Sequence, residues 1–149
     1  MSGKVFFYEP WDENGYLCNL SEYTVFYDGL LWPTSEHCYQ AQKHSDPEYR
    51  ERVRNAKTCQ EAIALGRDES SPSYRKDWMD VRVSLMHDIV LEKFKQHDDI
   101  RRLLLSTGDA YLAEHTANDH FWGDGGDGSG ENVLGKVLMR VREELSGKA

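Results

Sequence analysis

The sequence predicts a mainly helical α+β domain with a small antiparallel β-sheet. Three observations predict this fold class: helix-capping residues recur through the first two thirds of the chain, apolar residues repeat at near-helical spacing in its later part, and β-prone runs flank an Asp-Gly dipeptide. The 149 residues suit one hydrophobic core, so we expect a single domain over residues 1–149.

The β-prone runs are short and concentrate near the N-terminus. Residues 5–8 are one such run, and residues 24–27 lead through Asp28-Gly29 into residues 30–32. An Asp-Gly pair between two apolar runs favours a tight hairpin. A further short strand is expected at residues 111–115.

Capping residues mark where the helices begin. Thr34 or Ser35 is suited to cap a first helix, Asp46 precedes a proline at the first helical position, and Thr58 has capping-box spacing to a glutamate. Gly66 suits the end of the Thr58 helix. Further helices are expected after Asp77, over residues 98–106, and over residues 133–146 with Gly147 as the stop.

Composition narrows the class of function. The net charge is −8 and the predicted pI is about 5.2, which disfavours general binding to a phosphate backbone and favours a small molecule or one nucleotide held in a pocket. The three cysteines form no CxxC pair, so neither a disulfide framework nor a zinc knuckle is expected. Without an apolar span or a secretory signal, we expect a cytoplasmic protein (or a nuclear one in a eukaryote) and no membrane partner.

One polar stripe could carry chemistry. Glu36, Gln40 and Lys43 stand at i, i+4 and i+7, so on a helix they share one face. A carboxylate, an amide and an amine on one face could serve acid–base or covalent catalysis on a sugar, although a solvated polar face has the same spacing. His37 has no second ligand at a metal-binding spacing, so no metal role is expected.

A Gly-rich loop is the second candidate. Five glycines fall within residues 123–130, and the loop runs directly into the last helix. Its backbone N–H groups and the helix N-terminus predict a phosphate or pyrophosphate site. A calcium loop is excluded because His120 and Trp122 would occupy ligand positions, whereas a plain surface loop remains open.

Trp78 is the third candidate. It follows Arg75 and lies between Arg67 and Arg82 in the sequence, so it could stack on a base while an arginine meets a phosphate. It could equally begin the core face of its helix.

These blocks, in this order, resemble the YbiA-like NADAR family of N-glycosidases. The resemblance covers nearly the whole chain. One departure is Cys18, at a position where the family often has serine, and we expect it to have little effect. The matching stretches are residues 14–20, 32–43, 65–67, 75–78 with Arg82 and Met86, 107–108, 121–125, 130–135 and 138–139.

The resemblance implies the YbiA-like/NADAR fold and hydrolysis of an N-glycosidic bond between ribose and a base. It implies two substrates: ADP-ribose on guanine in nucleic acid, which we expect first, and a phosphoribosylamino-uracil intermediate of the riboflavin pathway. A non-catalytic ADP-ribose or nucleotide reader would use the same loop and Trp78 without needing Glu36 or Lys43.

Loss of the base leaves oxocarbenium character on the sugar, so a carboxylate is needed nearby. Glu36 is the first candidate and Asp119 or Asp124 the next, while Lys43 could attack the sugar and form a Schiff base. No cofactor and no metal are expected. The residues expected to bind substrate are Asn19, Gln40, Arg67, Trp78, Trp122, Gly123, Gly125, Gly130 and Asn132.

Overall fold

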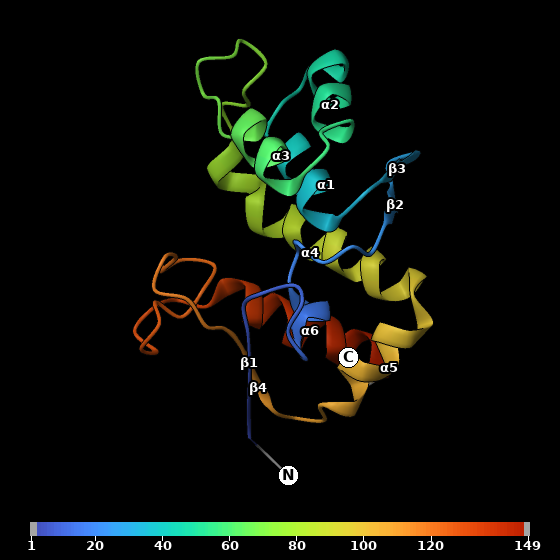
Figure 1. The fold of residues 1–149 in the computed structure, drawn as a ribbon, viewed down its shortest axis with the longest axis vertical. Coiled ribbons are helices and arrows are strands. Elements are labelled where there is room, and N and C mark those ends of the chain that lie inside the picture. The colour runs from blue at the N-terminus through green and yellow to red at the C-terminus, as the bar shows by residue number, and fades with distance from the viewer. Residues whose placement is uncertain (1–2, 148–149) are drawn as a thin grey trace. The chain divides into compact units, whose positions relative to one another are not determined.

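A computed structural model describes residues 3–147 (Figure 1). The chain divides into two compact units, one of residues 1–21 with 94–149 and the other of residues 22–93, and each is described by itself. The described elements are β1 (Lys4–Phe7), the 3-10 turn η1 (Gly15–Leu17), β2 (Val25–Tyr27), β3 (Leu30–Trp32), α1 (Ser35–Ala41), α2 (Pro47–Arg54), α3 (Cys59–Gly66), α4 (Trp78–Gln96), α5 (Asp98–Ser106), β4 (Tyr111–Glu114) and α6 (Val133–Ser146).

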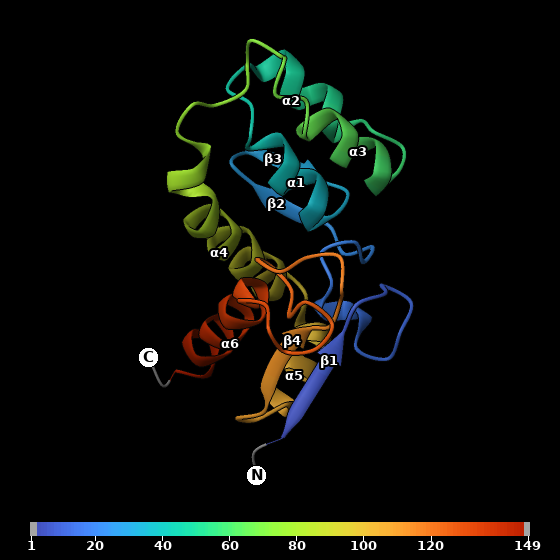
Figure 2. The ribbon, with the colours of Figure 1, turned by 90° about the vertical axis from the view of Figure 1, so that its left-hand side faces the viewer.

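The 22–93 unit begins with the predicted antiparallel hairpin. Strands β2 and β3 pair with Val25 opposite Trp32, and Asp28 and Gly29 both adopt positive φ at the turn, as a tight hairpin requires. Helix α1 follows and packs against both α2 and α3 (Figure 2). Trp32, Cys38 and Val53 are almost completely buried in this unit.

Local capping bonds explain where three of these helices begin. The side chain of Thr34 accepts a bond from the N–H of His37, and the side chain of Asp46 caps α2 with Pro47 as its first residue. Thr58 caps α3 by accepting from the N–H of Glu61. These three predicted helix starts are confirmed.

Helix α1 is shorter than the polar stripe suggested. It ends at Ala41, and Lys43 follows in a turn in which its N–H reaches only three residues back, to the carbonyl of Gln40. A continued helix would need an N–H from Pro47 for the Lys43 carbonyl, and proline has none; the carbonyl instead accepts from the N–H of Arg75 at 2.8 Å. The expectation that Lys43 continues the helix was therefore wrong.

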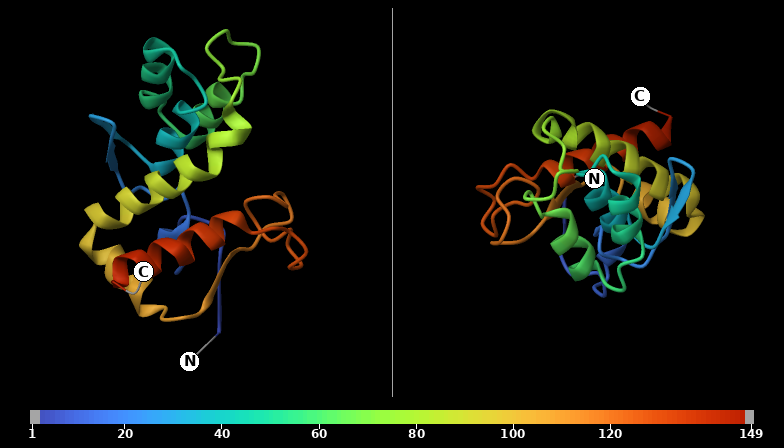
Figure 3. Two further views of the ribbon diagram at one scale, coloured as in Figure 1. Left: turned by 180° about the vertical axis from the view of Figure 1, so that it is seen from behind. Right: turned by 90° about the horizontal axis from the view of Figure 1, so that it is seen from above.

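The other unit contains a parallel strand pair that the sequence did not predict. Strands β1 and β4 pair in register from Lys4 opposite Tyr111 to Phe7 opposite Glu114. Phe7 and Leu112 are buried, and β4 contacts α6. Figure 3 shows the long loop between β4 and α6, which ends at the N-terminus of α6.

The remaining predicted elements are confirmed within a residue or two. Helix α5 covers residues 98–106, and α6 ends at Ser146 with Gly147 as its C-cap, whose φ of 78° is the left-handed conformation that glycine adopts readily. Among the described residues, no helix is long and apolar enough to cross a membrane.

Candidate active site

Lys43 lies in an apolar setting built from two aromatic rings. The residue is 9% exposed, and its Nζ lies 5.4 Å from the ring centroid of Tyr39 and 5.8 Å from that of Trp78. The two rings are themselves 5.2 Å apart and tilted by 59°. Among residues 3–147, no carboxylate oxygen lies within 4.0 Å of this amine. The Lys43 amine is therefore surrounded by the π faces of two aromatic rings, and it forms no salt bridge with the described residues.

This setting favours the neutral amine. Burial lowers the pKa of Lys43 below its usual value, and the charges of Arg67 and Arg82 lower it further. Glu36 and Glu69 act in the opposite direction, but the net shift is downward. Lys43 therefore carries a free electron pair at lower pH than an exposed lysine does.

Glu36 lies in the first turn of α1 and is shifted in the opposite direction. Burial raises the pKa of its carboxyl, although the bond from Gln40 and the charges of Lys43 and Arg67 lower it. Gln40 Nε2 donates to Glu36 Oε2 at 2.7 Å. The acid and the amine thus have pKa values moved toward each other, an arrangement typical of acid–base sites.

Gln40 and Arg67 complete this group of residues. Gln40 is 3% exposed, and its Oε1 has no hydrogen-bond partner among the described residues. Arg67 caps the C-terminal end of α3 and is exposed, and its guanidinium has no bond or ion pair within residues 3–147. An exposed cation whose charge reaches both Glu36 and Lys43 is suited to hold a phosphate.

Trp78 is buried, at 5% exposure, as the first residue of α4. Its ring covers Lys43 and meets Tyr39, which agrees with the core-facing alternative weighed from the sequence. Stacking of Trp78 on a base remains a prediction.

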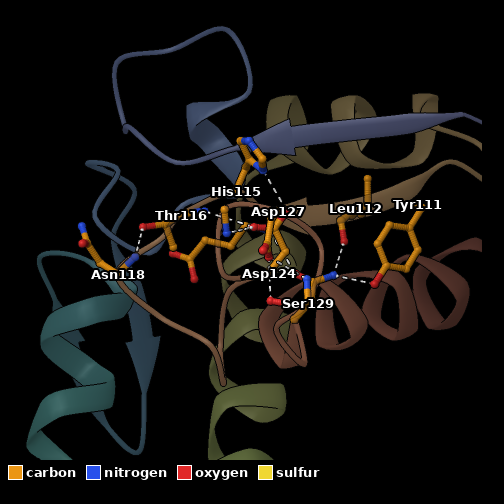
Figure 4. Close-up of polar contacts among 11 residues, drawn as sticks. Tyr111, Leu112, His115, Thr116, Asn118, Asp124, Asp127 and Ser129 are labelled. Atoms are coloured by element: carbon orange, nitrogen blue, oxygen red, sulfur yellow. Dashed lines mark hydrogen bonds and ion pairs between the residues drawn. The ribbon is translucent and has the colours of Figure 1, made fainter.

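The other unit holds the second group of candidates, which centres on Asp124 (Figure 4). The carboxylate of this buried residue accepts bonds from His115 Nδ1 at 2.8 Å, the Gly126 N–H at 2.8 Å and the Thr116 N–H at 3.3 Å. Burial alone would raise the pKa of Asp124, but these bonds lower it below its usual value. Asp124 is therefore a fixed carboxylate at the centre of the loop.

The Gly-rich loop directs several N–H groups inward, to its own acceptors. Gly128 and Gly130 both donate to the carbonyl of Asp124, and Gly125 donates to the carbonyl of Asp119. The carboxylate of Asp119 accepts from the N–H groups of the two residues after His120, Phe121 at 2.9 Å and Trp122 at 2.8 Å. A phosphate at these groups would have to replace internal bonds, and the phosphate role of the loop stays a prediction.

The same loop borders a cavity of about 500 Å³ that residues of β1 and β4 also line. His115, whose ring contacts that of Phe6 at a tilt of 47° with centroids 4.7 Å apart, lines this cavity. Because Nδ1 of His115 is used by Asp124, Nε2 is the nitrogen left for other contacts. The lining residues are Lys4, Phe6, Tyr111, Ala113, His115, Asp124, Asp127, Gly128 and Gly130.

The side chain of Asn132 has a structural role in this unit. Its Nδ2 donates to the Leu112 carbonyl at 2.9 Å and to the Tyr111 hydroxyl at 3.0 Å, and its Oδ1 accepts from the Glu114 N–H at 3.0 Å. These bonds use both amide hydrogens and tie the start of α6 to β4. Trp122 is partly buried, Gly123 and Asn19 are buried, and all remain candidates for substrate contact.

The structure thus brings Glu36, Gln40, Lys43, Arg67 and Trp78 together in the 22–93 unit. Sequence reasoning missed Tyr39, whose i, i+4 spacing to Lys43 was an available signal. It also missed His115, for which no local pattern existed. Among residues 3–147, no cluster of three or more histidine, cysteine or acidic side chains is arranged to hold a metal ion.

Several known proteins are similar to this chain over nearly its whole length. The chain is 46% identical to N-glycosidase YbiA of Escherichia coli over 140 residues, which cover 94% of this chain and 87% of that protein. It is 47% identical over 145 residues to a riboflavin biosynthesis protein of Vibrio vulnificus, covering 97% of this chain but only 39% of that longer relative. An N-glycosidase of Nostoc punctiforme is 42% identical over 144 residues, 95% of this chain and 92% of the relative.

The NMR structure of E. coli YbiA matches with a TM-score of 0.89 and 44% identity, over 98% of this chain and 86% of that one. The predicted fold class is therefore confirmed. The model of the NADAR domain matches residues 6–146, nearly the full length. This chain belongs to the NADAR domain family.

Proposed function

We propose that this protein is an N-glycosidase that cleaves the bond between a ribose and a nitrogenous base. The observation that carries the proposal is the setting of Lys43. This buried amine has a lowered pKa, and it interacts electrostatically with the Glu36 carboxyl, whose pKa is raised. Such a pair supplies a nucleophile and a proton donor at the same pH. The names of the E. coli and Nostoc relatives support the reaction class.

In this mechanism, the neutral amine of Lys43 attacks the anomeric carbon of the ribose. The bond from that carbon to the base breaks, its electron pair leaves with the base, and the proton of the Glu36 carboxyl goes to the leaving nitrogen. The Glu36 carboxylate then takes a proton from the alkylated amine. The bond from the anomeric carbon to the ring oxygen then breaks and the remaining hydrogen of the amine passes to that oxygen, which gives an open-chain Schiff base. Water hydrolyses the Schiff base to the free sugar and the lysine amine.

The simpler alternative keeps the same residues and forms no covalent bond. Glu36 as a carboxylate would activate a water molecule and stabilise the positive charge that develops on the sugar. Lys43 would then assist only as a cation. Trapping of a covalent sugar adduct distinguishes the two routes.

For the substrate, the two candidates are those implied by the family. Two relatives, from Vibrio vulnificus and from maize, are named riboflavin biosynthesis proteins, which favours the phosphoribosylamino-uracil. ADP-ribose on guanine in nucleic acid is the second candidate, and the exposed Arg67 suits the phosphate of either. The net charge of −8 favours the smaller substrate over a long polymer.

The test is to incubate the protein with each substrate and follow base release by chromatography. We expect release from at least one substrate, loss of release in Lys43→Arg and in Glu36→Gln, and no change in the exposed control Lys57→Ala. A protein that binds ADP-ribose but releases no base from either substrate would be a reader, and the proposal would be wrong.

A further inference from the structure

Gly66 lies so close to Gln40 that no larger residue fits at this position. A Cβ added to Gly66 would stand 2.7 Å from the Cβ of Gln40 and would overlap its amide oxygen. Carbon atoms in contact are normally separated by about 3.5–4.0 Å, so one of the two residues would have to move. Gln40 is buried, which leaves its side chain little space to move into.

The end of α3 cannot retreat easily from Gln40, because two side chains hold its last carbonyls. His44 Nε2 donates to the Gly66 carbonyl at 3.0 Å, and the Tyr49 hydroxyl donates to the Leu65 carbonyl at 2.5 Å. The rings of His44 and Tyr49 stack with centroids 3.9 Å apart. These bonds satisfy carbonyls that a helix end otherwise leaves without a partner.

The orientation of His44 is fixed in turn by Ser73. A carbonyl only accepts, so Nε2 of His44 carries the hydrogen and Nδ1 accepts from the Ser73 hydroxyl at 2.7 Å. His44 is completely buried, and burial lowers its pKa, which keeps the ring neutral. The contact of Gly66 with Gln40 therefore rests on a rigid support.

One hydrogen bond with the described residues orients the amide of Gln40. Its Nε2 donates to Glu36 Oε2 at 2.7 Å, while its Oε1 has no hydrogen-bond partner among the described residues. Its direction is thus set by the bond to Glu36 on one side and by packing on Gly66 on the other. A change at Gly66 would be transmitted through Gln40 to the carboxyl of Glu36.

We propose that Gly66 and His44 are positioning residues that orient the Glu36 carboxyl through the Gln40 amide. The inference rests on the proposed function only in naming Glu36 as the group that serves the reaction. The bond from Gln40 stabilises the carboxylate form, so its loss raises the pKa of Glu36 further. The other titratable or charged groups that act on Glu36 or respond to it are His37, Lys43, Cys59 and Arg67.

The experiment follows the titration of Glu36 directly, by the carbon-13 chemical shift of its carboxyl group in glutamate-labelled protein. Gly66→Ala should move the midpoint to higher pH by about half a unit or more. It should also reduce the kcat of base release by about tenfold with little change in KM, because an orienting contact is lost and substrate contacts are kept. Helix propensity alone would favour alanine at this position.

Three further variants show whether the effect on Glu36 passes through the Gln40 amide. Gln40→Met keeps the volume but removes the amide, and it should reproduce both effects even if Gly66→Ala folds poorly. Adding Gly66→Ala to Gln40→Met should then change the Glu36 midpoint no further, because the amide that the alanine displaces is already absent. His44→Phe should shift the midpoint in the same direction by a smaller amount.

Ala64→Gly is the matched control, because it weakens the same helix at an exposed position without adding an atom beside Gln40. It should lower the melting temperature and leave the Glu36 titration unchanged. An unchanged midpoint in both Gly66→Ala and Gln40→Met would overturn the inference. The titration needs no turnover, so this outcome is distinct from a failure to release base, which would contradict the proposed function instead.

Discussion

The amine of Lys43 lies 5.8 Å from the centroid of the Trp78 ring, and among residues 3–147 no carboxylate is close enough to form a salt bridge with it. A buried lysine is ordinarily paired, because an unpaired charge in a low-dielectric site is costly. Here the cost is lowered by the π faces of Trp78 and Tyr39 and by the shift toward the neutral amine. This setting supports the nucleophilic role that we propose for Lys43.

The first prediction concerns a covalent adduct. If Lys43 forms a Schiff base, borohydride added during turnover should attach a reduced sugar to that residue, detectable by mass spectrometry of proteolytic fragments. Lys43→Arg should give no adduct and lose at least about 100-fold in kcat although it keeps the charge. A Lys43→Ala variant that turns over near the wild-type rate would refute the covalent role.

The second prediction concerns pH. The active form of the Glu36–Lys43 pair holds one proton, so kcat/KM should rise through the lower pKa of the pair and fall through the upper one. Because burial raises the pKa of Glu36 and lowers that of Lys43, the two limbs should lie closer together than the ordinary values of about 4.3 and 10.4. A profile that is flat across this range would contradict the roles of both residues.

The third prediction concerns Arg67. Its guanidinium is exposed and has no bond within the described residues, so Arg67→Ala should change the free energy of unfolding by no more than about 0.5 kcal/mol. For a phosphate-bearing substrate, KM should rise about tenfold or more. The exposed Arg102 provides a control, and Arg102→Ala should leave KM unchanged. Equal KM values in the two variants would exclude phosphate contact by Arg67.

The fourth prediction concerns Asp124 and acid stability. The folded-state pKa of this carboxyl is depressed, so its contribution to stability is present above the unfolded value of about 3.9 and is lost as pH falls through the lower folded value. Asp124→Asn should therefore lower the free energy of unfolding at pH 7 by about 1–3 kcal/mol and flatten its dependence on acid pH. Denaturant unfolding from neutral to acid pH measures both, and the exposed Asp99→Asn should match wild type.

The fifth prediction concerns Asn132, which has a φ of 53° and whose side chain forms three hydrogen bonds with residues of β4. Asn132→Ala should cost about 2–4 kcal/mol of stability, because it loses the bonds and places alanine in the left-handed region. Asn132→Gly relieves the backbone strain but not the lost bonds, so it should recover part of that loss. Thermal unfolding distinguishes the three proteins, and an unaltered melting temperature in Asn132→Ala would show that these bonds are dispensable.

Local signals were sufficient for much of the fold. Thr34, Asp46 and Thr58 cap helices within three residues of themselves, and the Asp28-Gly29 turn joins strands that are adjacent in the chain. Such bonds form between near neighbours, so the residue types alone indicate them. The predicted helix 98–106 and the stop at Gly147 succeeded for the same reason.

The candidate site was only partly accessible to such reasoning. The spacing of Glu36, Gln40 and Lys43 grouped residues that interact in the structure, although Lys43 lies in a turn past the end of α1. Past the end of α1, the Lys43 carbonyl binds the N–H of Arg75, a contact between distant residues that no spacing indicates. The roles of these side chains as substrate contacts stay predictions.

The sequence by itself therefore determined the helix starts, the hairpin and the grouping of Glu36 with Gln40 and Lys43, because each depends on neighbours a few residues away. Only the tertiary structure decided the parallel pairing of β1 with β4, which joins Lys4 to Tyr111, and the contact of Gly66 with Gln40. It also decided the chemical state of Lys43. Burial and the two rings set the pKa of its amine, and burial is a property of the packed chain that no short segment contains.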